Sequence, residues 1–290
     1  MKIGIIGAGR MGCALALGLK QKGFTISGIY SRNEESARAL SGKLDNSCCD
    51  SLTGTVKNAN VIFIAVPDNA IESVASEIAS IAGHAGIWGK TFFHCSGGLT
   101  SEVLNPLEKL GGYTGSFHPI QTFADKENGW KGLENSYFGF EGSSEARKDA
   151  DTIIRAFGGR ILDVRKEDKP LYHAAACILS NYLVTLSWVA GNLFSTIGID
   201  HDAGVKALMP LLEKTVKNID TMGSLNALTG PISRGDYGVV QGHVKALQQK
   251  SPGTVDLYKI LGRAAVEMAL KRGSICEEDS DKLNEVLRDN

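Results

Sequence analysis

Three side chains that can exchange protons or hydrogen-bond a ligand occur at four-residue steps in the segment HAAACILSNYL: His173, Cys177 and Asn181. Each step advances about 40° around an α-helix, so the three form one slowly rotating stripe about 12 Å long that can border a single cleft. Histidine has a pKa near neutrality, which suits a group that donates a proton during a reaction. The alternatives are a histidine that serves helix packing and a polar seam in a membrane span.

The clearest ligand-binding motif is GAGRMG, which contains Gly7, Gly9 and Gly12 and lies between an apolar segment and a helical pattern. In a G-x-G-x-x-G motif the first glycine permits a tight turn, the second lets the backbone approach a pyrophosphate, and the third allows close helix packing. The N-terminus of the helix favours the anion. We therefore predict a dinucleotide site that includes these glycines, Arg10 and Met11. A glycine-rich turn without a ligand is the alternative.

The type of dinucleotide is indicated about twenty residues further on, where an acidic side chain would bind the ribose 2′-hydroxyl of NAD. Here the second predicted strand ends GIYSRNEE, and Ser31, Arg32 and Asn33 occupy that corner. A guanidinium beside hydroxyl and amide groups suits a 2′-phosphate, so we predict NADP, bound by Ser31 and Arg32. The alternatives are that Arg32 is a solvated loop charge and that Glu34 or Glu35 reaches back to the ribose.

Small and polar residues follow three further apolar segments, VIFIAV, KTFFH and GYTGSFH. Ligands of open parallel sheets bind at the carboxyl ends of the strands. The predicted contacts are Val66, Pro67 and His94 with the cofactor and Ser96, Gly97 and His118 with the substrate. His94 and His118 are candidates for lining the nicotinamide pocket, and a satisfied core imidazole is the alternative for each. Asp68 is expected to cap the helix that follows, and a contact with the ligand is the alternative.

The pattern of the chain provides a scaffold that brings such strand ends together. Up to about residue 165, short apolar segments alternate with helical patterns, which predicts a doubly wound α/β sheet. The predicted strands are KIGIIG, TISGIY, VIFIAV, KTFFH, GYTGSFH, YFGFEG and GRILDV. About five helices are predicted beyond them, near residues 171–197, 202–221, 237–249, 254–271 and 277–288, with Pro210 kinking or splitting the second. We therefore predict an N-terminal Rossmann-like NADP-binding domain, residues 1–166, followed by an all-α C-terminal domain, residues 167–290.

The composition argues for a small-molecule partner. The chain has 31 basic and 32 acidic side chains, and its net charge of −1 offers no field for nucleic acid or anionic lipid. The N-terminus begins directly with an apolar strand pattern and shows no secretory signal. The six cysteines form no C-x-x-C motif, and the adjacent Cys48 and Cys49 are poorly placed for an ordinary disulfide. We expect a cytoplasmic protein with reduced thiols.

One segment is long enough to cross a membrane, since residues 171–199 contain no Asp, Glu, Lys or Arg. Polar interruptions at Ser180, Asn181, Thr185 and Asn192, and amphipathic sequence on both sides, argue against a span. We predict a buried helix of a soluble protein and no membrane partner.

The motifs GAGRMG, AVPD, HCSGG, FHPIQTF, YHAAA, SNY and ALTGPISRGD together resemble a bipartite Rossmann-like family whose helical C-terminal half is a domain of unknown function. That family is similar to the wider 6-phosphogluconate dehydrogenase-like superfamily, which includes ketopantoate reductase, prephenate dehydrogenase, pyrroline-carboxylate reductase and deazaflavin-dependent NADP reductases. The resemblance covers nearly the whole chain. It implies a cofactor domain, a helical domain that binds substrate and dimerises, and a substrate cleft between them, so we expect a homodimer.

The resemblance also suggests roles for the helical stripe. Ketopantoate reductases carry a lysine four residues before an asparagine on this kind of helix, but here that position is Cys177. Prephenate dehydrogenases carry a histidine on the corresponding helix, which implies that His173 is the general acid and that Asn181 orients the substrate oxygen. We predict an NADP-dependent oxidoreductase that transfers a hydride between the nicotinamide and a small 2-oxo or 2-hydroxy acid, ketopantoate-like, or a cyclic imine acid. A non-catalytic NADP(H) sensor or scaffold is the alternative.

The segment ALTGPISRGD, residues 227–236, is predicted to form a substrate-facing loop because its glycines and proline make a turn between helices. The fork of Arg234 can bind a carboxylate through two parallel hydrogen bonds, and Thr229 and Asp236 are further candidate contacts. An Arg234–Asp236 pair that only ties the loop down is the alternative.

Two other chemistries have little support. The histidines and cysteines of the candidate site lack the closely paired spacings of a structural zinc site, so no metal is predicted. Ser96 does not lie in a G-x-S-x-G elbow, which argues against nucleophilic hydrolysis.

Overall fold

The computed structural model of the protein describes residues 1–44 and 50–288. The chain divides into two compact units, Met1–Ser180 and Asn181–Asn290. The first unit contains a mostly parallel β-sheet with helices, and the second is helical, as the sequence predicts.

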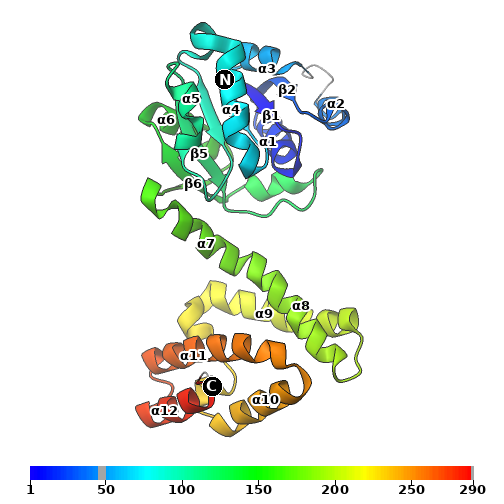
Figure 1. Ribbon diagram of the computed structural model, residues 1–290, viewed down its shortest axis with the longest axis vertical. Helices are drawn as coiled ribbons and strands as arrows, with labels where there is room; N and C mark the ends of the chain where they lie inside the picture. Colours follow the sequence, from blue (N-terminus) through cyan, green and yellow to red (C-terminus); the bar gives the residue numbers. More distant parts are fainter. Residues whose placement is uncertain (45–49, 289–290) are drawn as a thin grey trace. The chain divides into compact units, whose positions relative to one another are not determined.

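Within the described residues, the first unit is built on a seven-stranded sheet in the order β2-β1-β3-β4-β5-β6-β7 (Figure 1). Strands β1 to β5 are parallel to one another, and β6 lies antiparallel to β5 and parallel to β7. All seven predicted strands are confirmed: β1 (Lys2–Ile6), β2 (Thr25–Tyr30), β3 (Val61–Ile64), β4 (Thr91–His94), β5 (Tyr113–Pro119), β6 (Tyr137–Gly142) and β7 (Arg160–Asp163).

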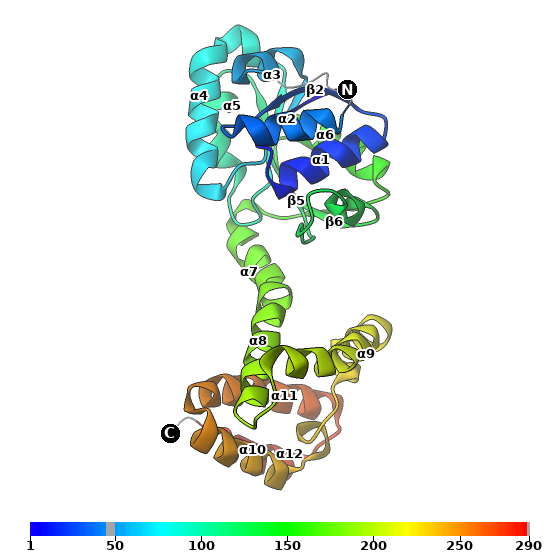
Figure 2. The same ribbon diagram turned by 90° about the vertical axis from the view of Figure 1, so that its right-hand side faces the viewer.

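Helices cover both faces of this sheet, which explains why its central strands β3 and β4 are buried at every residue instead of at alternate residues (Figure 2). One face packs against α1 (Arg10–Gln21), α2 (Glu34–Gly42) and α6 (Ser144–Ala156), and the other against α3 (Leu52–Asn58), α4 (Asp68–Ile87) and α5 (Asn105–Glu108). In the first core, neighbouring phenylalanine rings lie between 5.2 and 5.4 Å apart: Phe63, Phe93, Phe117 and Phe138. This packing fixes β5 and therefore the position of His118, which follows Phe117.

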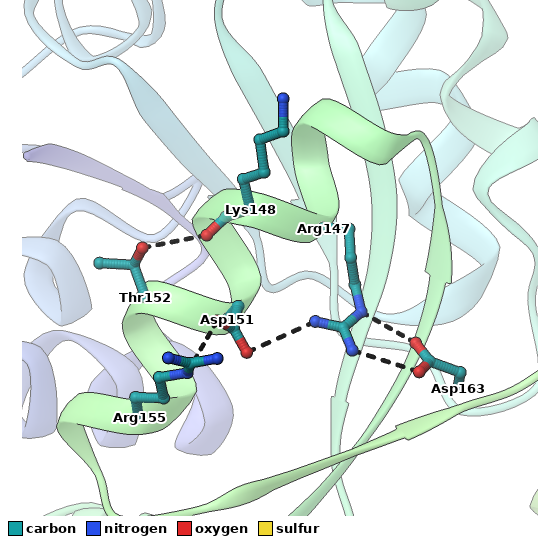
Figure 3. A network of polar contacts seen from close by, with 6 residues as sticks. All are labelled: Arg147, Lys148, Asp151, Thr152, Arg155 and Asp163. Atoms are coloured by element: carbon teal, nitrogen blue, oxygen red, sulfur yellow. Dashed lines mark hydrogen bonds and ion pairs between the residues drawn. The ribbon is translucent and has the colours of Figure 1, made fainter.

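A polar network on the surface fastens α6 to the end of β7 (Figure 3). The Arg147 guanidinium donates from Nε to Asp163 Oδ1 at 2.9 Å and from Nη2 to Asp163 Oδ2 at 3.2 Å. Arg147 and Arg155 also pair with Asp151, which lies between them on the helix. Hydrogen bonding to Arg147 holds the pKa of Asp163 below its ordinary value. Because these groups are largely solvated, the network orients α6 more than it stabilises the fold.

The predicted helix 171–197 is divided into α7 (Lys169–Leu179), which belongs to the first unit, and α8 (Asn181–Ser195), which begins the second. The two compact units thus meet after α7, whereas the predicted domain boundary lies before it, between residues 166 and 167. That boundary stays a prediction.

The second unit contains, besides α8 and among its described residues, α9 (His201–Ala227), α10 (Tyr237–Lys250), α11 (Val255–Arg272) and α12 (Glu277–Val286). Its core joins α10, α11 and α12 through apolar side chains such as Val244, Val266 and Leu283. Of the two effects predicted for Pro210, splitting of the second helix is wrong, since α9 runs through this residue and is interrupted instead at Gly223. The predicted kink at Pro210 stays a prediction.

The prediction that the uncharged segment is buried is also wrong for the single chain. Most side chains of α7 and α8 are at least partly exposed, including Leu179 and Val184. Among the described residues, one helix, Lys166–Ser195, is long and apolar enough to cross a membrane by length and composition. Isolated soluble chains rarely expose large contiguous apolar patches, so this surface is unusual.

The turn from β1 into α1 depends on two glycines of the GAGRMG motif. Gly7 has a backbone φ of +104°, a region that residues with a side chain rarely adopt. A Cβ at Gly12 would overlap the carbonyl oxygen of Gly7, so the helix packs against the turn only with glycine there. By contrast, a Cβ at Gly9 would meet no other atom within 4 Å.

This difference predicts the effect of adding one methyl group at each position. Gly12→Ala should lower the free energy of unfolding by at least about 1–3 kcal/mol, because the obstructing atom is backbone. Gly9→Ala is the matched control, and as a helix N-cap change it should cost less than about 1 kcal/mol. Urea denaturation measures both, and equal losses would contradict the packing role of Gly12.

Candidate active site

A cavity of about 440 Å³ opens at the carboxyl ends of β1, β2 and β3. Six predicted cofactor contacts line it: Gly7, Gly9, Ser31, Arg32, Val66 and Pro67. Arg10 and Met11 lie next to it, in the first turn of α1. The structure thus gathers residues from three separate loops, which are far apart in the sequence, around one space.

The cavity fits the diphosphate of a dinucleotide. Helix α1 begins after Gly9 without a side-chain cap and without an acidic residue in its first turn, so its first N–H groups are available to an anion. The space beside Gly9 that a side chain would fill remains open. Gly12 is buried against the turn, so its contribution is to packing.

The corner after β2 leaves the Arg32 side chain available to a ligand in the cavity. The Arg32 side chain is exposed at the cavity, while the Asn33 side chain accepts a hydrogen bond from the N–H of Ser36 and caps α2. Glu34 pairs with Arg38 at 2.9 Å instead of reaching back to the cavity. Glu77 of α4 also lines the cavity, a residue that the sequence did not single out.

The loop after β4 is held by buried polar contacts. His94 is fully buried: its Nδ1 accepts from the N–H of Ser96 at 3.2 Å and its Nε2 lies 3.1 Å from the carbonyl of Thr100. Burial, helped by the nearby Lys169 charge, lowers the pKa of His94 to about 4. This geometry favours the core imidazole that was the alternative, and the predicted cofactor contact of His94 stays a prediction without support from it.

Ser96 is equally enclosed in this loop. Its hydroxyl donates to Asp68 Oδ2 at 2.7 Å and accepts from the N–H groups of Gly98 and Leu99. The expectation that Asp68 caps α4 is wrong, because Pro67 occupies the cap position and the Asp68 carboxylate binds Ser96. The substrate contact predicted for Ser96 stays a prediction, since its hydroxyl already has these partners.

Two imidazoles from different elements meet beside this loop. His118 of β5 and His173 of α7 have ring centroids 5.9 Å apart and perpendicular planes. Gly97 separates them: a Cβ there would lie 2.6 Å from His173 Cδ2 and 2.9 Å from His118 Nε2. The structure therefore brings together Gly97, His118 and His173, and any side chain at Gly97 would displace one ring. Cys177, one turn beyond His173, has its sulfur 3.8 Å from His173 Nε2.

A lysine that the sequence did not single out lies beneath these residues. Lys169, at the start of α7, is fully buried, and its Nζ donates to Ser116 Oγ at 2.6 Å and to the carbonyl of Ser96 at 3.3 Å. Burial lowers the pKa of Lys169 to about 8, against the opposing charges of Glu141 and Asp68. The ammonium ties α7, β5 and the loop after β4 to one another.

The remaining predicted site residues belong to the second unit. Asn181 is the first residue of α8, and its carbonyl accepts from the Thr185 hydroxyl. Arg234 pairs with Asp236 at 3.0 Å, the contact expected if the arginine ties its own loop. The pair is exposed to solvent, so a carboxylate can still reach the guanidinium. The substrate roles of Asn181, Thr229, Arg234 and Asp236 stay predictions.

The loop that carries Arg234 is fixed by another arginine, which the sequence did not indicate. Arg272, at the end of α11, donates to the carbonyls of Asn226 and Leu228 and to the Ser233 hydroxyl. The loop can therefore present Arg234 from a defined backbone.

The described residues contain no group of three or more His, Cys, Asp or Glu side chains that could hold a metal ion. Cys13, Cys95, Cys177 and Cys276 are not disulfide-bonded. Cys48 and Cys49 lie outside the described residues.

Comparison with protein families agrees with this arrangement. Residues 2–87 match the model described as NADP oxidoreductase coenzyme F420-dependent, and residues 136–265 match a domain of unknown function, DUF2520. The chain thus combines a Rossmann domain of NADP-dependent oxidoreductases with a DUF2520 region. The predicted resemblance, the predicted fold class and NADP as the cofactor are confirmed. No curated protein matches the sequence.

Solved structures resemble the chain over nearly its full length. The protein BF3122 of Bacteroides fragilis, provisionally described as an NADP oxidoreductase, is 26% identical, with 92% of this chain and 98% of that chain covered and a TM-score of 0.73. TM1727 of Thermotoga maritima is 25% identical, with coverages of 94% and 100% and a TM-score of 0.74. The Plasmodium falciparum pyrroline carboxylate reductase with NADP bound is 14% identical, with coverages of 99% and 98% and a TM-score of 0.57, which shows a shared fold.

The buried lysine predicts a specific pH dependence of stability. The pKa of Lys169 falls from 10.5 to about 8 on folding, so between these values the unfolded chain binds more protons and the Lys169 contribution to stability rises with pH. Relative to Lys169→Met, the wild-type protein should gain up to about 3 kcal/mol of unfolding free energy from pH 8 to 10.5.

Urea denaturation across this pH range measures the difference. Lys166→Met, which removes an exposed lysine three residues away, is the control and should retain the rise. Parallel stability curves for wild type and Lys169→Met would contradict the burial of an ammonium at this position.

Proposed function

We propose that the protein is an NADP-dependent reductase or dehydrogenase that acts on the C=O or C=N bond of a small acid, either a 2-oxo acid of the ketopantoate kind or a cyclic imine acid. The observation that carries the proposal is the pair of imidazoles around Gly97, at the same carboxyl edge of the sheet as the dinucleotide cavity. A proton donor beside a hydride donor is what reduction of such a bond requires.

The residues of the cavity fit the cofactor. The turn from Gly7 to Gly9 and the first N–H groups of α1 would bind the diphosphate, and Ser31 and Arg32 would bind the 2′-phosphate. When bound, the reduced nicotinamide supplies the hydride that adds to the substrate carbon. Val66 and Pro67, which follow β3, line the same cavity and would contact the bound cofactor.

His173 supplies the proton that the substrate oxygen or nitrogen gains. It lies on the surface of the first unit beside Gly97 and is only half-buried, so it can recover a proton from solvent after each turnover. The roles proposed for residues of the second unit rest on the sequence alone: Asn181 would orient the reacting oxygen, and the fork of Arg234 would bind the substrate carboxylate. Thr229 and Asp236 are further candidate substrate contacts in the loop that carries Arg234.

Cofactor preference tests the corner after β2. Arg32→Ala should reduce the affinity for NADPH tenfold to a hundredfold and leave that for NADH nearly unchanged, since one charge-assisted hydrogen bond contributes on the order of 1.5–3 kcal/mol. Fluorescence titration with each cofactor gives the ratio. Arg38→Ala, on the exposed side of α2, is the matched control. An unchanged ratio in Arg32→Ala would mean that the guanidinium does not bind the 2′-phosphate.

Catalysis is tested by NADPH oxidation with a panel of 2-oxo acids and cyclic imines. With the best substrate, His173→Ala should lower turnover by about a hundredfold to ten-thousandfold while NADPH binding changes little. His84→Ala, a histidine near the far end of α4, should keep full activity. Full activity of a folded His173→Ala variant would mean that another residue transfers the proton. If the protein binds NADPH but no compound causes its oxidation, the alternative of a non-catalytic NADP(H) sensor would be favoured.

We also propose that a second copy of the chain covers the apolar face of the helical unit. On α8, Val184 is 71% exposed and Trp188 60%, and α9 adds Leu211 and Val216. Such a surface has the apolar character of obligate dimer interfaces. A dimer that buries this apolar face would not present it to a membrane, in line with the cytoplasmic location that we propose.

Sedimentation of the full chain tests this assembly. The wild-type protein should sediment as a dimer at micromolar concentration, and Val184→Asp combined with Trp188→Lys should sediment as a monomer. Recovery of the wild-type chain in the membrane fraction, or a monomer that stays soluble, would refute the dimer.

A further inference from the structure

Among the described residues, His118 has a hydrogen-bond partner on one ring nitrogen, Nδ1. Its Nδ1 lies 2.7 Å from the Tyr172 hydroxyl, and the two rings are nearly perpendicular, with centroids 5.6 Å apart. Tyr172 comes from α7, the helix that also carries His173, and its hydroxyl is packed against Gly139 of β6, where a Cβ would overlap it. The phenol therefore has no freedom to leave His118.

The direction of this hydrogen bond follows from the partners of the phenol. Burial raises the pKa of Tyr172 to about 12, so the hydroxyl keeps its proton, and backbone hydrogen bonding from Gly139 occupies its oxygen. Among the described residues, His118 is the only acceptor that the phenol proton has. Tyr172 thus donates to Nδ1, and a neutral imidazole that accepts at Nδ1 carries its own proton on Nε2.

The other ring nitrogen of His118, Nε2, has no hydrogen-bond partner among the described residues. A Cβ at Gly97 would lie 2.9 Å from this atom, so the position next to it is free of side-chain atoms only because residue 97 is glycine. The neighbouring space is the one kept free by Gly97, bordered on its other side by His173.

We propose that Tyr172 is a positioning residue that holds His118 in the Nε2–H form, so that this N–H is a fixed hydrogen-bond donor to the substrate atom that His173 protonates. The inference rests on the proposed function for the identity of that atom. His118 keeps its proton throughout, while His173 gives one up and regains it from solvent. A neutral imidazole can polarise a carbonyl or imine in this way without a change of charge.

The charges around His118 keep it neutral. Burial lowers the pKa of His118 to about 4, and the Lys169 ammonium and His173 act in the same direction. The charged or titratable groups at this edge come from α4, β4, β6 and α7: Asp68, His94, Glu141, Lys169, Tyr172 and His173. The carboxylate of Glu141 is occupied by Ser101, and that of Asp68 by Ser96, so neither binds His118.

Nuclear magnetic resonance of the full chain labelled with ¹⁵N-histidine tests the inference without substrate or cofactor. His118→Gln identifies the His118 signals among the six histidines. We expect the Nε2–H form from pH 5 to 9, with no protonation in that range. An Nδ1–H form, or protonation of His118 at pH 6–7, would overturn the proposal.

Two variants separate the contributions of its neighbours. Tyr172→Phe should populate the Nδ1–H form, whereas Tyr182→Phe, an exposed tyrosine of α8, should not. An unchanged spectrum in folded Tyr172→Phe would overturn the role of Tyr172. Lys169→Met should raise the pKa of His118, because a nearby positive charge is removed, and the neutral ring should keep the Nε2–H form. This result would support the inference even if Tyr172→Phe does not fold, and loss of the Nε2–H form in Lys169→Met would count against it.

The inference and the proposed function can fail separately. An inactive protein with the Nε2–H form would refute only the proposed reaction, and an active reductase with the Nδ1–H form would refute only this inference.

Discussion

The buried ammonium of Lys169 is the contact on which the arrangement of the candidate site depends. A buried charge is costly unless it is hydrogen-bonded, and Lys169 finds its acceptors in the Ser96 carbonyl and the Ser116 hydroxyl. Those acceptors belong to the loop after β4 and to β5, while Lys169 begins α7. Satisfying one cation therefore fixes three segments at the carboxyl edge. The same contact places the helix so that its next turn carries Tyr172 and His173 alongside the loop.

The two ends of the proposed site use different physical means. The cofactor end relies on backbone: a turn that requires glycine, a helix N-terminus without a cap, and one guanidinium in solvent. The reaction end relies on buried side chains whose hydrogen bonds are nearly all satisfied inside the protein. Rigid, water-poor surroundings let a few dipoles act strongly on a reacting bond, whereas a cofactor that must bind and leave needs an accessible cavity.

Much of the first unit could be predicted from the sequence because its signals are local. Apolar segments of five to seven residues between helical patterns predicted all seven strands, and the GAGRMG motif predicted the turn at Gly7. Lys169 could not be found in this way: it lies in the charged segment RKEDKP, where a lysine ordinarily faces solvent, and only tertiary packing buries it. His94 illustrates the converse, since a histidine at a strand end can face a ligand or its own loop. The burial predicted for α8 was wrong for the single chain. An apolar sequence indicates that a helix face avoids water, but it does not indicate whether the same chain covers that face.

The central claim is that the nicotinamide of the cofactor reaches the two imidazoles around Gly97. The most direct measurement follows the ring signals of His118 and His173 while the protein is saturated with NADPH or with 2′,5′-ADP, a fragment that has the adenine and 2′-phosphate but no nicotinamide. NADPH should shift both histidines, and the fragment should bind near Arg32 and shift neither. If saturating NADPH leaves both rings unchanged, the carboxyl edge of β4 and β5 is not the reaction centre.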